Sequence, residues 1–125
     1  MNVVDSCGWL EYFADGPNAD FFAPAIEETN RLVVPTLILF EVFKRVLQQR
    51  NEADALRSIG LMRQGRCVDL TDSLAIGAAS LSVELKLPLA DSIILHIARN
   101  QGATLWTQDA HFEGLQGVRY IRKAG

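Results

Sequence analysis

Short β-type apolar segments alternate along the chain with longer segments of helical periodicity. The strand-like segments are residues 2–4, 32–34, 67–70, 103–106 and 118–121, and the helical ones are 6–13, 19–26, 36–49, 51–64, 74–85 and 90–100. Strands separated by helices are expected to lie parallel, because parallel neighbours need the crossover that a helix provides. The alternation therefore predicts an α/β sandwich around a largely parallel sheet.

The chain's 125 residues suit one core, so we expect a single domain over residues 1–125. No apolar run reaches the roughly 18 residues that a membrane span requires. The first five residues offer neither the basic region nor the apolar segment of a secretion signal. We therefore expect a cytoplasmic protein that makes no membrane contact.

The net charge of −3 disfavours a protein that holds nucleic acid by phosphate neutralisation alone. Cys7 and Cys67 lack the spacing of metal ligands. In a reducing compartment a disulfide between them is disfavoured, and we expect both to be buried as small apolar residues.

Four carboxylates occupy positions where a site would form. Asp5 follows the first strand-like segment, Asp109 follows the fourth, and Asp91 lies at the start of a helical segment. Glu41 lies one turn into another helix, among apolar neighbours where a carboxylate is unexpected. In open α/β sheets, ligands bind beyond the carboxyl ends of the strands.

Each acid also has an ordinary structural explanation. Asp5, Asp91 and Asp109 stand where Asp commonly caps a helix, and Glu41 can pair with Arg45 four residues later. A common site is favoured because separate segments would deliver carboxylates to one sheet edge, where their repulsion is costly without a cation. Carboxylate oxygens suit Mg²⁺ or Mn²⁺, and no His or Cys cluster offers the ligands that zinc prefers. We therefore expect a divalent-ion site.

Four motifs containing these acids resemble those of a known family. They are VVDSCGWL (3–10), PTLILFEV (35–42), LPLADSII (87–94) and TQDAHF (107–112). Over nearly its whole length the chain resembles the PIN-domain ribonucleases and, by its size, the VapC toxins of bacterial VapBC toxin–antitoxin pairs. The third motif is the most distinctive, and the first alone would be weak.

The resemblance implies a three-layer α/β/α sandwich and an Mg²⁺-dependent endoribonuclease, with Mn²⁺ as a substitute. It also implies a toxin of a type II pair that forms a homodimer and is inhibited by a VapB-like antitoxin. The metal-binding and catalytic residues would be Asp5, Glu41, Asp91 and Asp109. The hydroxyls of Ser6 and Thr107 would orient them. Many relatives carry a further acid where this chain has His111, so the second metal subsite is left open.

Basic residues near the motifs are candidates for holding RNA phosphates: Lys44, Arg45, Lys86 and Arg99. Solvated helix faces carry such residues without any function. His96 and Trp106 are expected to be packed rather than catalytic. The predicted inward stripe of the 36–49 helix is Leu37, Phe40, Phe43, Val46 and Leu47.

Small residues in the 74–85 helix allow two interpretations, a dimer seam or packing against the chain's own sheet. The residues concerned are Ala75, Ala78, Ala79 and Ser82.

Three other functions remain as alternatives. An RNA-processing or quality-control nuclease would use the same fold and site. A phospho-acceptor signalling domain would need adjacent acids after the first strand and a lysine near the last, whereas Ser6 and Cys7 follow Asp5 and Lys123 is almost terminal. A catalytically inactive interaction domain is disfavoured by the presence of all four acids.

Overall fold

The computed structural model describes all residues from 1 to 125. The strands are β1 (Asn2–Val4), β2 (Val33–Pro35), β3 (Arg66–Val68), β4 (Thr104–Thr107) and β5 (Val118–Tyr120). The α-helices are α1 (Ser6–Phe13), α2 (Ala19–Glu27), α3 (Thr36–Gln49), α4 (Glu52–Met62), α5 (Asp72–Leu85) and α6 (Leu89–Asn100). Two 3₁₀ turns, η1 (Thr29–Arg31) and η2 (Ala110–Phe112), complete the elements.

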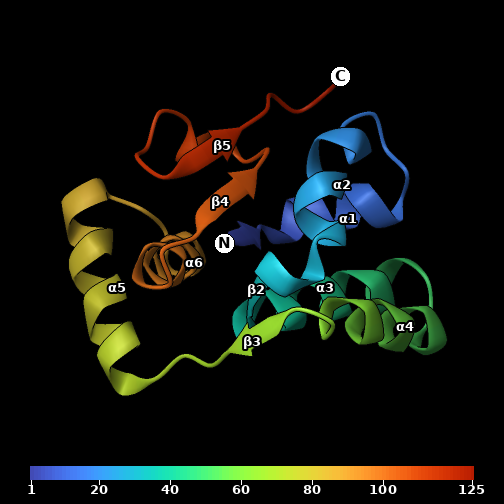
Figure 1. Cartoon of the computed structure of the whole chain (residues 1–125), viewed down its shortest axis with the longest axis horizontal. Helices are drawn as coiled ribbons and strands as arrows, with labels where there is room; N and C mark the ends of the chain where they lie inside the picture. The colour runs from blue at the N-terminus through green and yellow to red at the C-terminus, as the bar shows by residue number, and fades with distance from the viewer.

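Every strand pairing is parallel, as the alternation of elements predicted. One sheet has the order β1-β4-β5, and a second consists of β2 and β3. A single parallel bridge between Asn2 and Leu32 joins the two sheets. Figure 1 shows α5 and α6 on one side of the strands and α1, α2 and α4 on the other. The predicted three-layer α/β/α sandwich is confirmed.

The inward face of α3 differs from the predicted stripe. Its buried residues are Ile38, Val42 and Val46, which recur every four residues. Phe40 is instead 60 % exposed, and Leu47 is also exposed. The rest of the predicted stripe is confirmed, because Val46 is buried and Leu37 and Phe43 are partly buried against the core. Apolar residues occur around most of this helix, so periodicity did not show that Phe40 and Leu47 lie outside the packed face.

Of the small residues predicted to form a seam on α5, Ala78 packs against α6 of the same chain. Ala78 is buried with Leu74 against Ile93 and Ile97 of α6. A seam through Ala78 to a second copy is therefore wrong, because α6 of the same chain already covers this residue. Ile76 and Val83 remain exposed on α5.

His96 and Trp106 are packed, as expected. A side chain at Gly77 would collide with the His96 ring, so glycine permits α5 to approach α6 there. Trp106 is half-buried, and its indole N–H donates to Asn2 Oδ1 at 2.9 Å.

Both cysteines are free, but Cys67 is exposed and Cys7 is only partly buried. The prediction that both are buried is therefore wrong. The reason for Cys67 is that β3 pairs with β2 alone and lies at the edge of its sheet.

No single helix is long and apolar enough to cross a membrane. Taken together, α5 and α6 have the length and apolar composition of a membrane span, but the chain bends by 113° between them.

Candidate metal centre

Asp5 lies where β1 ends and α1 begins, and its side chain is almost fully buried. One carboxylate oxygen accepts from the Ser6 backbone N–H at 2.8 Å, which caps α1. The other accepts from the Thr107 hydroxyl at 2.8 Å. Burial raises the pKa of Asp5 to about 6, although these hydrogen bonds oppose the rise.

Thr107 connects two of the acids. Its hydroxyl oxygen accepts from the backbone N–H of Asp109 at 2.9 Å while its hydrogen goes to Asp5. Since Thr107 is the last residue of β4 and is fully buried, it fixes both acids relative to the sheet. The orienting role that the family resemblance implied for Thr107 would use these two hydrogen bonds.

Glu41 of α3 lies close enough to Asp5, Asp91 and Asp109 to be affected by their charges. Its Oε1 atom is buried and has no hydrogen-bond partner. Burial raises the pKa of Glu41 to about 7, and the negative charges of Asp5, Asp91 and Asp109 raise it further, while the Ser6 side chain lowers it. The alternative that Glu41 serves a helical pair with Arg45 finds no support in this unpaired oxygen.

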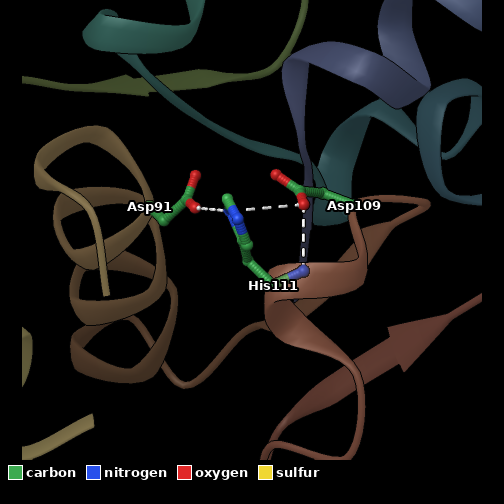
Figure 2. Close-up of side chains that lie close together, drawn as sticks. All are labelled: Asp91, Asp109 and His111. Atoms are coloured by element: carbon green, nitrogen blue, oxygen red, sulfur yellow. Dashed lines mark hydrogen bonds and ion pairs between the residues drawn. The ribbon is translucent and has the colours of Figure 1, made fainter. Parts of the chain in front are cut away.

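Asp91, Asp109 and His111 form the third part of the site, as Figure 2 shows. Asp91 Oδ2 lies 2.7 Å from His111 Nδ1, which is 3.5 Å from Asp109 Oδ1. Burial raises the pKa of Asp91 and the charge of Asp109 adds to this rise, whereas the hydrogen bond to His111 lowers it. The hydrogen bond to Asp91 raises the pKa of His111.

Two of the four acids cap helices and also belong to the candidate site. Asp5 caps α1, and Asp109 caps η2 by accepting from the His111 backbone N–H at 3.0 Å. Asp91 does not cap α6, because Pro88 holds that position without any side-chain bond. Capping therefore does not account for Asp91, nor for Glu41 in the second turn of α3.

The donor set fits a divalent ion. Ligand atoms of Asp91, Asp109 and His111 all lie within 4.8 Å of one another. The unpaired Glu41 oxygen is a buried acceptor that lacks a positive partner. Burial raises the pKa of the Cys7 thiol to about 12, and its Sγ atom lies 3.5 Å from Asp5 Oδ2 and 3.4 Å from Thr107 Oγ1.

The predicted basic contacts divide by position. Lys44 and Arg45 line a hollow of about 320 Å³ together with Glu41, Phe40 and Gln48. Arg99 lies in the last turn of α6 and donates to the Gln116 carbonyl at 2.9 Å. Lys86 is exposed at the left-handed end of α5.

Sequence reasoning did not identify two features of this site. The contact of His111 with Asp91 joins residues 20 positions apart, and no local pattern indicates it. Phe40 was assigned to the core, although it lies exposed beside the hollow that contains Glu41.

Several solved structures with the same fold are described as parts of toxin–antitoxin systems. A toxin–antitoxin complex from Klebsiella pneumoniae is 21 % identical, with a TM-score of 0.80 over 95 % of this chain and 96 % of that one. VapC20 of Mycobacterium tuberculosis, a sarcin-ricin loop cleaving toxin, is 14 % identical, with a TM-score of 0.75 over 93 % and 95 %. DNA-bound VapBC from Salmonella typhimurium is 16 % identical, with a TM-score of 0.73 over 98 % of both chains.

No curated protein matches the sequence. The profile of the PIN domain family, however, matches residues 3–118, which include all four acids and His111. Because this match covers almost the whole chain, the chain belongs to the PIN-domain family.

Proposed function

We propose that this protein is an endoribonuclease that uses Mg²⁺ or Mn²⁺ to hydrolyse RNA phosphodiester bonds. The observation that carries the proposal is the unpaired, buried oxygen of Glu41, in the electrostatic reach of three further carboxylates. A bound divalent ion supplies the positive charge that activates water and stabilises charge developing on the phosphate. Membership of the PIN-domain family supports the same activity.

The protein's own residues hold and orient the reacting groups. Asp5, Glu41, Asp91 and Asp109 provide the negatively charged oxygens. Thr107 fixes Asp5 and Asp109 by its two hydrogen bonds, which limits the reorganisation needed when an ion binds. Ser6 anchors Asp5 through its backbone N–H and is also close enough to affect Glu41.

The hollow beside Glu41 suits the RNA strand. Lys44 and Arg45 supply positive charge for phosphates, and the exposed Phe40 ring offers a face on which an unpaired base can stack. Lys44 Nζ lies 5.8 Å from the centre of that ring. Lys86 and Arg99 stay weaker candidates, and Arg99 already bonds to a backbone carbonyl.

We further propose that the protein acts in the cytoplasm as the toxin of a toxin–antitoxin pair and forms a homodimer. Its structural neighbours include complexes of such pairs, which supports a VapB-like antitoxin partner. A groove of about 530 Å³, lined in part by Leu10, Phe13, Val46 and Leu61, offers apolar surface for that partner. The exposed Ile76 and Val83 on α5 offer apolar surface for a second copy.

The test of the activity is cleavage of end-labelled RNA by purified protein after removal of bound metal. Cleavage is expected only when Mg²⁺ or Mn²⁺ is added back, and EDTA should abolish it. Asp91→Asn should be inactive. Asp54→Asn should keep its activity, because this residue of α4 pairs with Arg50 and Arg57 instead. Undiminished cleavage after thorough chelation would refute the metal-dependent mechanism.

A further inference from the structure

His111 is held so that its ring lies between two acids of the site. Its backbone N–H donates to Asp109 Oδ1 at 3.0 Å, and its Nδ1 atom lies 2.7 Å from Asp91 Oδ2. Figure 2 shows the ring reaching from η2 toward α6 between the two carboxylates. The side chain is 60 % exposed, so packing does not impose this orientation.

A surface ion pair is an incomplete explanation for the contact. Exposed ion pairs contribute little to stability, because water screens the charges and ordering the side chains costs entropy. A single imidazolium would also leave the Glu41 Oε1 atom without a partner. The acids of this site therefore still need a cation when His111 contacts Asp91.

Imidazole nitrogen differs from carboxylate oxygen in the ions that it prefers. Mg²⁺ selects oxygen ligands and retains its water molecules. First-row transition ions accept imidazole more readily than Mg²⁺ does, and Mn²⁺ is the weakest and most oxygen-preferring of that series. Asp91 and Asp109 are hard oxygen donors acceptable to both kinds of ion, and their ligand atoms lie within 4.8 Å of that of His111. His111 is thus the residue of this cluster that distinguishes between them.

We propose that His111 is a nitrogen ligand of the ion held by Asp91 and Asp109, and that it favours Mn²⁺ over Mg²⁺. The inference rests on the proposed function, because it concerns the same metal centre. The proposal adds one ligand, His111, to the four acids and makes this residue responsible for the preference for Mn²⁺. The 2.7 Å contact places the imidazole beside Asp91, and an ion bound by His111 Nδ1 would take the place of the hydrogen in that contact.

Mn²⁺ binding to the full-length protein tests this directly, because Mn²⁺ is paramagnetic. Electron spin-echo spectra of the wild-type complex should show modulation from a directly coordinated ¹⁴N nucleus. The modulation should vanish in His111→Asn and persist in His96→Gln, which alters the other histidine of the chain, packed beside Gly77. Persistence of the nitrogen signal in His111→Asn would overturn the assignment.

Calorimetry of the same proteins with MnCl₂ and with MgCl₂ measures the choice of ion. The ratio of Mn²⁺ to Mg²⁺ affinity should fall by about tenfold or more in His111→Asn. His111→Asp, which restores an oxygen donor, should lower the ratio while retaining Mg²⁺ binding. An unchanged ratio in both variants would overturn the proposal.

The outcomes separate this inference from the proposed function. Mn²⁺ bound only by oxygen atoms, with RNA cleavage intact, would refute the role of His111 and leave the nuclease standing. Absence of any Mn²⁺ or Mg²⁺ binding to the wild-type protein would refute both.

Discussion

Two clusters of charged side chains in this molecule have opposite character. At the junction of α3 and α4, Asp54 pairs with Arg50 at 2.8 Å and also with Arg57. These hydrogen bonds lower the pKa of Asp54. In the metal centre, by contrast, the pKa values of Asp5, Glu41 and Asp91 are all raised.

The difference teaches how to tell a structural cluster from a functional one. Asp54 has its counter-charges within the chain and gains nothing from a further cation. The four acids share one exposed histidine. Burial raises the pKa values of Asp5, Glu41 and Asp91, because their negative charge is poorly solvated. An unfavourable arrangement that the fold nevertheless maintains points to a ligand that completes it.

The largest expected difference between the clusters is in catalysis. Asp91→Asn should reduce single-turnover RNA cleavage by at least about 100-fold, because it removes an oxygen ligand of the ion on which the chemistry depends. Asp54→Asn should cleave at the wild-type rate. Rates of end-labelled RNA cleavage measure both, and similar losses in the two variants would erase the distinction between the clusters.

Thermal stability should respond to metal through the metal centre and not through the Asp54 cluster. At 100 times its dissociation constant, Mn²⁺ should stabilise the wild-type protein by about 2.7 kcal/mol, or raise Tm by about 10 °C. Asp54→Asn should show the same shift, and Asp91→Asn a smaller one. Thermal unfolding with and without MnCl₂ gives the comparison, which equal shifts in all three proteins would contradict.

Without metal, the protein should become less stable as pH rises from 5.5 to 7.5. Because Asp5 and Glu41 have raised pKa values of about 6 and about 7, their folded forms bind protons more tightly than the unfolded chain, and this advantage is lost as pH increases. The raised pKa of His111 acts in the same direction, since the stability of its ion pair fades as the ring deprotonates.

The expected loss is on the order of 1–2 kcal/mol, with Glu41 given reduced weight because it is partly solvated. Urea unfolding in EDTA at several pH values measures it. Glu41→Gln should flatten the dependence. Asp54→Asn should not alter it, because a lowered pKa affects stability only in more acidic solution. A flat profile for the wild-type protein would mean that the acids are better solvated than their burial indicates.

The smallest expected effect is the change in Tm when Asp54, the acid of the cluster paired with arginines, is replaced. Asp54→Asn should change Tm by no more than about 3 °C, since exposed ion pairs contribute little and Asn51 continues to cap α4. Thermal unfolding in EDTA measures the change. A much larger drop would show that the arginine pairs are a major support of α4.

The positions of the acids were predictable where a local rule applied. Asp5 and Asp109 follow apolar strands whose carboxyl ends meet at one edge, and Glu41 interrupts an apolar helix. The exposure of Phe40 was not predictable, because α3 carries apolar residues on several sides and only its neighbours decide which are covered. The contact between His111 and Asp91 depends on how η2 packs beside α6, which local periodicity does not encode.

The division of the sheet places the candidate metal centre at a junction between two sheets. Strands β1 and β2 are connected by one backbone bridge, between Asn2 and Leu32, rather than by a continuous ladder. Glu41 belongs to the half that contains β2, whereas Asp5 and Asp109 belong to the half that contains β1 and β4. The two sheets share one hydrophobic core. An ion shared by these acids would add a second link between the sheets, close to the single bridge that joins their backbones.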